Sequence, residues 1–363
     1  MIKTVFKFLA CVSILSSALM MAPQARAEYS KPYIGDIIDY RAKFEDTFVY
    51  LARDYGLGYV EMRAANPGVD PWVPGAGTRL VLPSRHLLPD AQRKGVVINL
   101  PEMRLYYYRT KDGPPETFPI GIGREGLDTP LGVTTVVRKV DGPTWTPTAR
   151  MRREDPKLKP VVPPGPDNPM GTHALYLGFP LVAIHGTNRA FGIGRRISSG
   201  CIRLYPEDII SLFNMVPVGT RVNIIDQPIK VAWIGDELFL EAHPEVENAI
   251  KLEETGTMPA PRLREADMER IIKTAGIYKE RLRWPAIRTA LRERRGYPIA
   301  IARRPGVEVS EAGDEMAGPA LSKKEIKAEA KEALKKVYDG GDLEMKPEPV
   351  RSAHTQRTRR LNP

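Results

Sequence analysis

Two short alternating runs of hydrophobic and polar residues, 37–42 and 78–83, enclose two segments with helical spacing. The first segment begins at Phe48, and its apolar residues recur every three or four positions along one helical face. The second begins near Val60 and ends at an Asn-Pro-Gly turn. Gly56 separates the two segments. This order of elements predicts a small βααβ unit.

The stretch from residue 95 onward is rich in β-branched residues and alternating runs, which are typical of strands. The predicted strands are 96–100, 104–108, 133–140, 173–177, 181–186, 221–225, 230–234 and 237–240. One helix is predicted to begin at Pro206. A Pro-rich excursion over 142–171 is predicted to be a long loop. A loop of that length in a compact domain usually has a function, often as an active-site lid.

Beyond Pro244 the pattern becomes helical. Residues 263–275 and 284–295 predict two amphipathic helices, which form a small appendage. Residues 304–363 carry many charges of both signs and a single aromatic residue, so they are predicted to be disordered. Within them, 325–337 has the spacing of a helix with a narrow apolar face, which we interpret as a transient, solvated helix.

The first 27 residues have the pattern of a secretory signal peptide. Lys3 and Lys7 precede an apolar run over 8–22, and Ala25-Arg26-Ala27 forms a small-residue cleavage site. The apolar run is short for a membrane span, and an uncleaved anchor is the alternative. The pattern therefore predicts an exported, periplasmic protein.

The composition adds little to this picture, and the net charge by itself does not decide between classes of partner. Of 363 residues, 42% are hydrophobic, while 34 Pro and 30 Gly favour a β- and turn-rich fold over a helical bundle. A formal net charge of +10 suits nucleic acid, anionic lipid or an acidic polymer such as the cell wall. The export signal and the lack of a nucleic-acid-binding motif argue against nucleic acid.

Cysteine usage singles out one residue. Cys11 lies in the predicted signal peptide, so the exported chain keeps only Cys201 and can form no internal disulfide. A lone thiol in an oxidising compartment is either a reactive group or a buried, inert residue.

A histidine placed before this cysteine favours the reactive role. His185 ends an apolar strand, and Cys201 begins another extended run sixteen residues later, after a glycine-rich loop. If the two strands pair antiparallel, the loop brings imidazole and thiol together, as nucleophilic catalysis requires. The backbone N–H groups of Ser199, Gly200 and Cys201 are the predicted oxyanion hole.

This stretch resembles the YkuD-type L,D-transpeptidase family, whose pattern is HGT, then G, then S-x-G-C-x-R. The matching residues are His185-Gly186-Thr187, Gly194, Ser198, Gly200-Cys201 and Arg203. The segments 102–108, 143–148 and 165–171 are similar to the enterobacterial branch, which includes enzymes that attach Braun-type lipoprotein to peptidoglycan. Many members carry a second His where this chain has Ser199.

The βααβ unit has a resemblance of its own. The segments 45–47, 51–55 and 65–67 read Glu-Asp-Thr, Leu-Ala-Arg-Asp-Tyr and Ala-Asn-Pro. These words resemble a LysM domain, which binds the N-acetylglucosamine backbone of peptidoglycan. The alternative is a helical cap with no affinity for sugar.

The family resemblance implies a mechanism on peptidoglycan stem peptides. Cys201 would attack the meso-diaminopimelate carbonyl of a tetrapeptide stem and expel D-Ala, with His185 as base and then acid. The Gly186 carbonyl would orient the imidazole ring. The acyl group then passes to an amine, either another diaminopimelate (a 3→3 cross-link) or a lysine of an envelope lipoprotein or outer-membrane protein. A hydrolase on the same acyl-enzyme and a non-catalytic wall-binding protein remain as alternatives.

Other residues have both a functional and a structural interpretation. Arg203 could hold a substrate carboxylate or form an internal ion pair, and Trp145 could line the cleft or pack the lid. Ser198 and Asn188 are candidate substrate contacts that could instead hydrogen-bond the loop. His173 is interpreted as a strand-face residue. A zinc site built from His173, His185 and Cys201 lacks a fourth ligand, so no metal and no cofactor are predicted.

The predicted fold class is α+β, with a mostly β, sandwich-like catalytic domain that has mixed strands and one main helix. The predicted domains are a signal peptide (1–27), a LysM-like domain (37–83), a catalytic domain (95–226), a β-hairpin and helical appendage (227–303) and a disordered tail (304–363).

Overall fold

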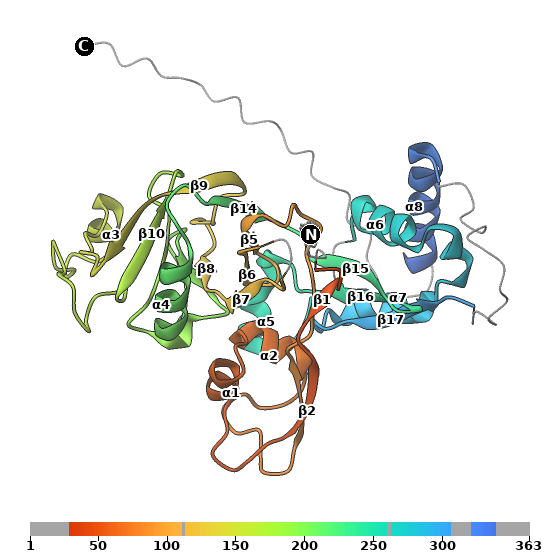
Figure 1. The fold of residues 1–363 in the computed structure, drawn as a ribbon. Helices are drawn as coiled ribbons and strands as arrows, with labels where there is room; N and C mark the ends of the chain where they lie inside the picture. Colours follow the sequence, from red (N-terminus) through yellow and green to blue (C-terminus); the bar gives the residue numbers. More distant parts are fainter. Residues whose placement is uncertain (1–28, 111–112, 260–262, 306–320, 339–363) are drawn as a thin grey trace, which may run out of the picture.

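The computed structural model describes residues 29–110, 113–259, 263–305 and 321–338. Figure 1 shows three parts: a small N-terminal unit, a central sheet that continues to the left of the view, and a C-terminal appendage to the right. The predicted signal peptide and much of the predicted tail lie outside the described residues. Among the described helices, none has the length and hydropathy needed to cross a membrane.

The N-terminal unit has the predicted βααβ order. It consists of β2 (Ile37–Arg41), α1 (Phe48–Asp54), α2 (Tyr59–Ala65) and β3 (Arg79–Pro83), and the two strands pair antiparallel. Thr47 caps α1, because its hydroxyl accepts a hydrogen bond from the Tyr50 N–H. Two further short strands, β1 (Tyr33–Ile34) and β4 (His86–Leu87), pair where this unit joins the rest of the chain.

The central domain is built on one mixed sheet of eight strands. In spatial order these are β13 (Ile202–Arg203), β11 (Ala183–His185), β10 (His173–Leu177), β9 (Gly132–Asp141), β14 (Arg221–Ile225), β5 (Gly95–Asn99), β6 (Arg104–Tyr108) and β7 (Glu116–Pro119). Separately, β8 (Ile122–Gly123) pairs with β12 (Arg196–Ser198). The longer predicted strands of this domain are confirmed, whereas β7, β8, β12 and β13 are too short to carry a recognisable pattern.

The sheet is curled, which corrects the predicted sandwich. Gly121, just after the edge strand β7, exchanges two backbone hydrogen bonds with Arg203 of the opposite edge strand. The two edges are thereby linked to each other, which satisfies edge groups that would otherwise be exposed. The predicted main helix is α4 (Pro206–Met215), and its buried Ile209 and Leu212 pack into the core of this sheet.

The two active-site strands do not pair antiparallel, which was the condition considered for bringing imidazole and thiol together. β11 and β13 run parallel, with Ile184 opposite Ile202 and His185 opposite Arg203. Parallel neighbours need a crossover connection of about a dozen residues or more. Residues 186–201 are long enough to supply it, and they contain a 3-10 turn, Ala190–Gly192, and β12.

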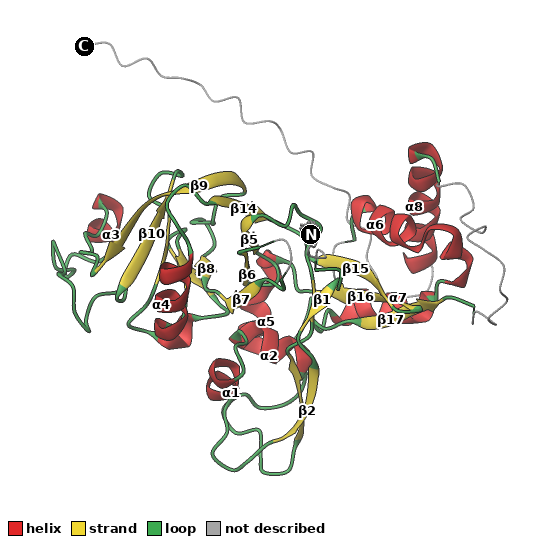
Figure 2. Cartoon of the chain, viewed as in Figure 1, coloured by secondary structure: helices red, strands yellow, loops and turns green. Residues whose placement is uncertain are grey.

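The appendage is a three-stranded sheet covered by helices (Figure 2). Its strands are β15 (Ile229–Ile234), β16 (Glu237–Ala242) and β17 (Ile299–Arg303), and its main helices are α6 (Glu265–Ala275) and α7 (Trp284–Glu293). The predicted hairpin across Gly235 and the two predicted helices are confirmed. A further helix, α5 (Ala249–Thr255), packs against α2 of the N-terminal unit.

The predicted disordered tail is corrected over residues 321–338. This segment contains α8 (Lys323–Tyr338), which packs against α6. Ala330, Ala333 and Val337 are fully or almost fully buried in the same hydrophobic cluster as Met268 and Ile271. The apolar face of α8 is narrow, but its small alanines allow α8 to approach α6 closely. The high average charge of this segment therefore did not indicate that one of its faces is buried.

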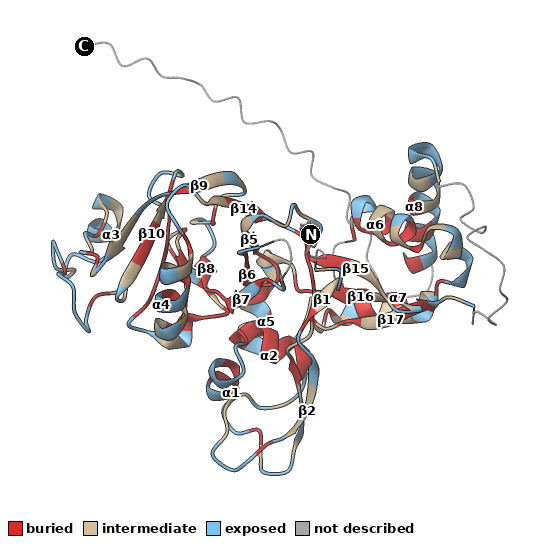
Figure 3. Cartoon of the chain, in the orientation of Figure 1, coloured by how far each residue is buried: buried red, intermediate tan, exposed pale blue. Residues whose placement is uncertain are grey.

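A buried ionic cluster joins the three parts of the molecule. Glu61 of α2 accepts a hydrogen bond from the Arg104 guanidinium of β6 at 2.9 Å. Lys230 of β15 pairs with Glu102 at 2.7 Å and with Glu241 of β16 at 2.6 Å, and all three side chains are fully buried. Removing one partner of such a cluster would leave an uncompensated buried charge, so these contacts specify how the parts fit together. Figure 3 shows α2 buried where it enters this junction.

One group in this junction has the geometry of metal ligands. The ligand atoms of His86, Glu102 and Glu241 lie within 4.8 Å of one another. Lys230 already pairs with both carboxylates. Its ammonium group therefore compensates their charge, and the cluster fits an internal ionic network better than a metal site.

Candidate active site

The fold brings the predicted nucleophile and base to one face of the sheet. Side chains alternate between the two faces of a sheet, so Cys201, one position before Ile202, shares a face with His185 of the neighbouring strand. On that face the Cys201 side chain packs with Ala183. The Cys201 thiol donates to the Leu181 carbonyl oxygen at 3.5 Å. Cys201 is partly accessible to solvent, as a nucleophile must be.

The imidazole of His185 is held in one orientation. Its Nδ1 lies 2.7 Å from the carbonyl oxygen of Gly186, and a carbonyl can only accept, so Nδ1 carries the proton. This contact is the one that the family resemblance implies for Gly186. In the neutral ring Nε2 is left with a lone pair, which is the form needed to accept a thiol proton.

Burial sets the resting protonation of both groups. It lowers the pKa of His185 to about 4, and the nearby Arg203 charge acts in the same direction, whereas the Gly186 and Met170 carbonyls oppose it. Burial also raises the pKa of the Cys201 thiol, against the Ala183 N–H and the Arg203 charge. At neutral pH both groups are therefore uncharged, a thiol and an imidazole on the same face of the sheet.

Ser198 organises the cysteine loop. Its hydroxyl donates to the Cys201 carbonyl oxygen at 2.5 Å and accepts from the Gly200 N–H at 3.2 Å, and the side chain is almost completely buried. These bonds favour the loop interpretation of Ser198 over substrate contact. The Gly200 N–H is engaged in the loop in this structure. The oxyanion hole formed by the N–H groups of Ser199, Gly200 and Cys201 stays a prediction.

The Pro-rich excursion contacts this loop through a helix that the sequence pattern missed. Residues 142–171 contain α3 (Ala149–Glu154), capped by the Thr148 hydroxyl. Arg150 of α3 donates to the Ser199 hydroxyl oxygen at 3.1 Å and pairs with Glu154 at 2.5 Å. The excursion is therefore ordered against the residue next to Gly200-Cys201, in keeping with a lid.

Two more residues of the excursion lie beside the thiol. Met170 is buried in a small cluster with Ala174 and Ala183, and Trp145 and Cys201 pack against it. A backbone bridge between Trp145 and Val162 fixes the Trp145 segment. Trp145 thus packs the excursion and borders the nucleophile, which combines both interpretations of this residue. Met170 has no sequence signal beyond its place in a family-like segment.

Arg203 lies mostly buried near the nucleophile and has no carboxylate partner among the described residues. Its Nε is buried without a hydrogen bond, and burial together with the Arg189 charge lowers the pKa of its guanidinium. A buried, unpaired cation is costly, and a substrate carboxylate would compensate it. The predicted internal ion pair is therefore not the arrangement seen, and the carboxylate-binding interpretation is favoured.

The other two candidates lie away from the nucleophile. Asn188 is exposed and donates to the Asp167 carbonyl oxygen at 3.0 Å, so it ties the loop to the excursion. His173 points to the opposite face of the sheet, because its neighbour Ala174 pairs with His185. There its ring packs against Phe213, which confirms that it is a strand-face histidine.

Comparisons with known proteins agree with this site. The model of the YkuD family, described as an L,D-transpeptidase catalytic domain, matches residues 93–224. The chain is 47% identical over 248 residues to the probable L,D-transpeptidase ErfK/SrfK of Escherichia coli strain K12, a match that covers 66% of this chain and 79% of the relative. The chain belongs to the YkuD family of L,D-transpeptidases. It is therefore a cysteine-dependent acyltransferase of peptidoglycan.

Two further comparisons cover smaller shares of the chain. The probable L,D-transpeptidase YbiS of the same organism is 52% identical over 200 residues, which is 53% of this chain and 65% of the relative. The solved structure of the catalytic domain of an E. faecium L,D-transpeptidase is 24% identical, covers 38% of this chain and all of that domain, and superimposes with a TM-score of 0.30.

The structure explains one glycine of the YkuD motif in this transpeptidase. Gly194 has a φ of +73°, and a Cβ added there would lie 2.3 Å from both the Gly58 Cα and the Tyr59 N. The Gly194 carbonyl also accepts from the Val60 N–H at 3.1 Å. The active-site loop is thus seated on the first turn of α2, and the N-terminal unit supports it.

We expect Gly194→Ala to lower the free energy of unfolding by about 2–4 kcal/mol, because it combines a strained φ with a backbone clash. Gly126→Ala is the matched control, since Gly126 has a similar φ of +76° and no atom within 4 Å of the added Cβ. Chemical denaturation of both variants measures the difference. Equal destabilisation would show that the contact with α2 contributes nothing.

Proposed function

We propose that Cys201 forms a thioester with the meso-diaminopimelate carbonyl of a tetrapeptide stem. The thiol proton passes to His185 Nε2 as sulfur attacks, and the same proton then goes to the nitrogen of D-Ala as the C–N bond breaks. The observation that carries this proposal is the shared sheet face of thiol and imidazole, with Nδ1 of His185 held by the Gly186 carbonyl.

An amine completes the reaction. Its nitrogen attacks the thioester carbonyl, gives a proton to His185 and releases the Cys201 thiol. A second diaminopimelate as acceptor yields a 3→3 cross-link, and a lysine of an envelope lipoprotein or outer-membrane protein yields an attached protein. The excursion is the proposed means of favouring an amine over water, because Arg150 ties it to Ser199 and Trp145 packs against the same cluster as Cys201.

Arg203 is proposed to bind a carboxylate of the stem peptide. Its guanidinium lies near the nucleophile and lacks a carboxylate partner in the part of the chain that the structure describes. A stem peptide carries carboxylates close to the scissile bond, so one of them can form a charge-assisted pair with Arg203. Trp145, which packs against the same cluster as Cys201, is proposed to contact the apolar part of the stem peptide.

Mass spectrometry of purified tetrapeptide muropeptides after incubation tests the reaction. A diaminopimelate-linked dimer with loss of D-Ala is the expected product. Tripeptide alone would show that water resolves the acyl-enzyme, and unchanged tetrapeptide would contradict the proposal. A second incubation with an envelope lipoprotein shows whether a protein amine competes with diaminopimelate.

We place this activity in the periplasm, where the predicted signal peptide would deliver it. The N-terminal unit is proposed to bind the glycan of peptidoglycan as a LysM-like module. It exposes several large hydrophobic side chains, as sugar-binding surfaces do. These are Phe44, Tyr50, Trp72 and Val73.

Trp72→Ala is expected to weaken binding to purified sacculi several-fold while turnover of a soluble stem peptide stays unchanged, because Trp72 is far more exposed than a packing residue. Ile277→Ala, which removes an exposed hydrophobic side chain from the appendage, is the control. Substitution is preferable to deleting the unit, since deletion would strip Glu61 from the buried Arg104. Unchanged pull-down of Trp72→Ala would leave the unit as a structural cap.

A further inference from the structure

A basic cleft lies at the end of the molecule away from the active site. It encloses about 870 Å³ between the segment 88–93, β15, α6 and α8. In Figure 1 these helices lie at the right of the view, whereas α3 and β10, which border the active site, lie at the left. The cleft is therefore separate from the catalytic site.

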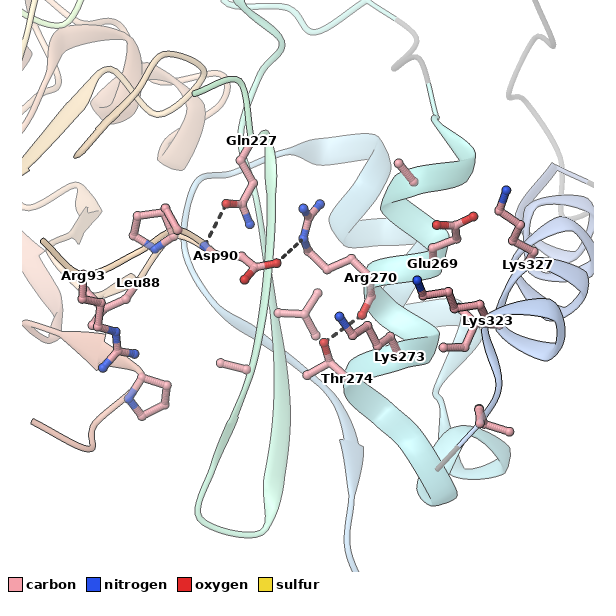
Figure 4. A pocket seen from close by; sticks show the side chains of 18 residues that line it. Leu88, Asp90, Arg93, Gln227, Glu269, Arg270, Lys273, Thr274, Lys323 and Lys327 are labelled. Carbon is pink, nitrogen blue, oxygen red and sulfur yellow. Dashed lines mark hydrogen bonds and ion pairs between the residues drawn. The ribbon is translucent and has the colours of Figure 1, made fainter. Parts of the chain in front are cut away.

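Positive charge faces this cleft from two helices. Lys273 comes from α6, and Lys323 and Lys327 come from α8 (Figure 4). All three side chains belong to exposed residues, and none forms an ion pair with another described residue. Arg93 and Arg270 add two more cations. Arg93 donates to the Tyr29 carbonyl oxygen, and Arg270 lies 3.8 Å from Asp90 and is partly neutralised.

The rest of the lining combines apolar residues with polar ones and one unpaired acid. Leu88, Val231 and Ile326 contribute hydrophobic surface from three elements. Glu269 of α6 also lines the cleft, and within the described residues it has no ion-pair partner. A ligand that satisfies this lining carries several carboxylates, an ammonium group and small apolar groups.

We propose that this cleft binds a second peptidoglycan stem peptide, distinct from the one acylated at Cys201. A tetrapeptide stem carries several carboxylates, which can pair with the lysines, and the free ammonium of diaminopimelate, which can pair with Glu269. The methyl groups of its alanines can pack on the hydrophobic side chains of the cleft. The inference rests on the proposed function for its substrate class. Its basis is this complementarity of charge and surface.

Two sites on one polymer act together. Once one stem occupies the cleft, other stems of the same sacculus are held near Cys201 at a raised effective concentration. The cleft thus increases the rate on polymeric substrate and leaves the rate on a soluble stem peptide unchanged. Because the lysines are exposed, binding should weaken as ionic strength rises.

The test compares two triple variants of the full exported chain in a Cys201→Ala background, so that binding is measured without turnover. Lys273→Gln/Lys323→Gln/Lys327→Gln removes the cleft lysines. Lys324→Gln/Lys331→Gln/Lys335→Gln removes the same charge from α8 at positions that do not line the cleft. We expect the cleft variant to bind sacculi about tenfold more weakly and the control to bind as the parent does, since three exposed charge contacts are worth roughly that much together.

The soluble tetrapeptide stem and its amidated form identify the ligand. Because the active site also binds a stem peptide, calorimetry should show two sites for the acidic form in the parent and one in the cleft variant. The second site should be absent for the amidated form. Equal weakening of both triple variants, or equal binding of both peptides, would overturn the proposal. A parent that binds no stem peptide outside the active site would also overturn the proposal.

With Cys201 restored, turnover of the soluble stem peptide separates the two claims. A cleft variant that turns over this peptide at the parental rate but binds sacculi weakly supports the cleft proposal. If the parent itself gives no turnover, the proposed reaction fails, whereas the binding comparison still decides the role of the cleft.

Discussion

Cys201→Ala is expected to abolish both thioester formation and transpeptidation. Cys201 is the single cysteine outside the predicted signal peptide, and it is packed on the same sheet face as His185. The acyl-enzyme should disappear from intact-protein mass spectra after incubation with a carbapenem, a covalent probe that the family resemblance suggests.

The fold of this variant should be intact, because the exchange removes one sulfur atom from a partly exposed side chain. Unchanged thermal unfolding and unchanged sacculus binding are the controls. A variant that still forms a covalent adduct, or still turns over stem peptide, would show that another residue is the nucleophile.

His185→Gln is expected to slow acylation by about 10²–10⁴-fold, the usual contribution of general acid–base catalysis. The glutamine amide can still donate to the Gly186 carbonyl but cannot accept the thiol proton. Since burial raises the pKa of the Cys201 thiol, the thiolate is scarce at neutral pH without a base. Part of the lost rate should therefore return as the pH rises toward the pKa of the thiol.

The wild-type enzyme should show a different pH profile. Burial lowers the pKa of His185 to about 4, so the base stays unprotonated through the mildly acidic range. Its acylation rate should hold steady down to about pH 5 and fall only as the pH approaches the lowered pKa. Stopped-flow acylation by a carbapenem across this range measures both profiles.

His173→Gln is the matched control for the base. His173 lies on the opposite sheet face against Phe213, so this variant should acylate at nearly the wild-type rate. Wild-type acylation by His185→Gln at every pH would remove His185 from the mechanism. A large loss in His173→Gln instead would assign the base to that residue.

Sequence alone determined the elements whose signals are local. The βααβ unit followed from helical spacing, strand alternation and the residues that end helices, and such signals act within a few residues of one another. The paired roles of His185 and Cys201 followed from residue types, their placement at strand ends and the resemblance to a family motif. The hairpin at Gly235 followed from the backbone freedom of glycine in a tight turn.

Tertiary structure alone decided the features that depend on distant partners. The parallel pairing of β11 with β13 is set by which strands close the curled sheet. Only two residue pairs are involved, so the sequence of these short strands does not indicate whether they run parallel or antiparallel. The packing of α8 depends on α6, which lies some fifty residues earlier. Burial of Glu61 with Arg104, and of Lys230 with Glu102, requires three separate segments to exclude water together. Local patterns describe how a segment folds, whereas these contacts arise only when whole segments meet, because burial and charge compensation are properties of the assembled molecule.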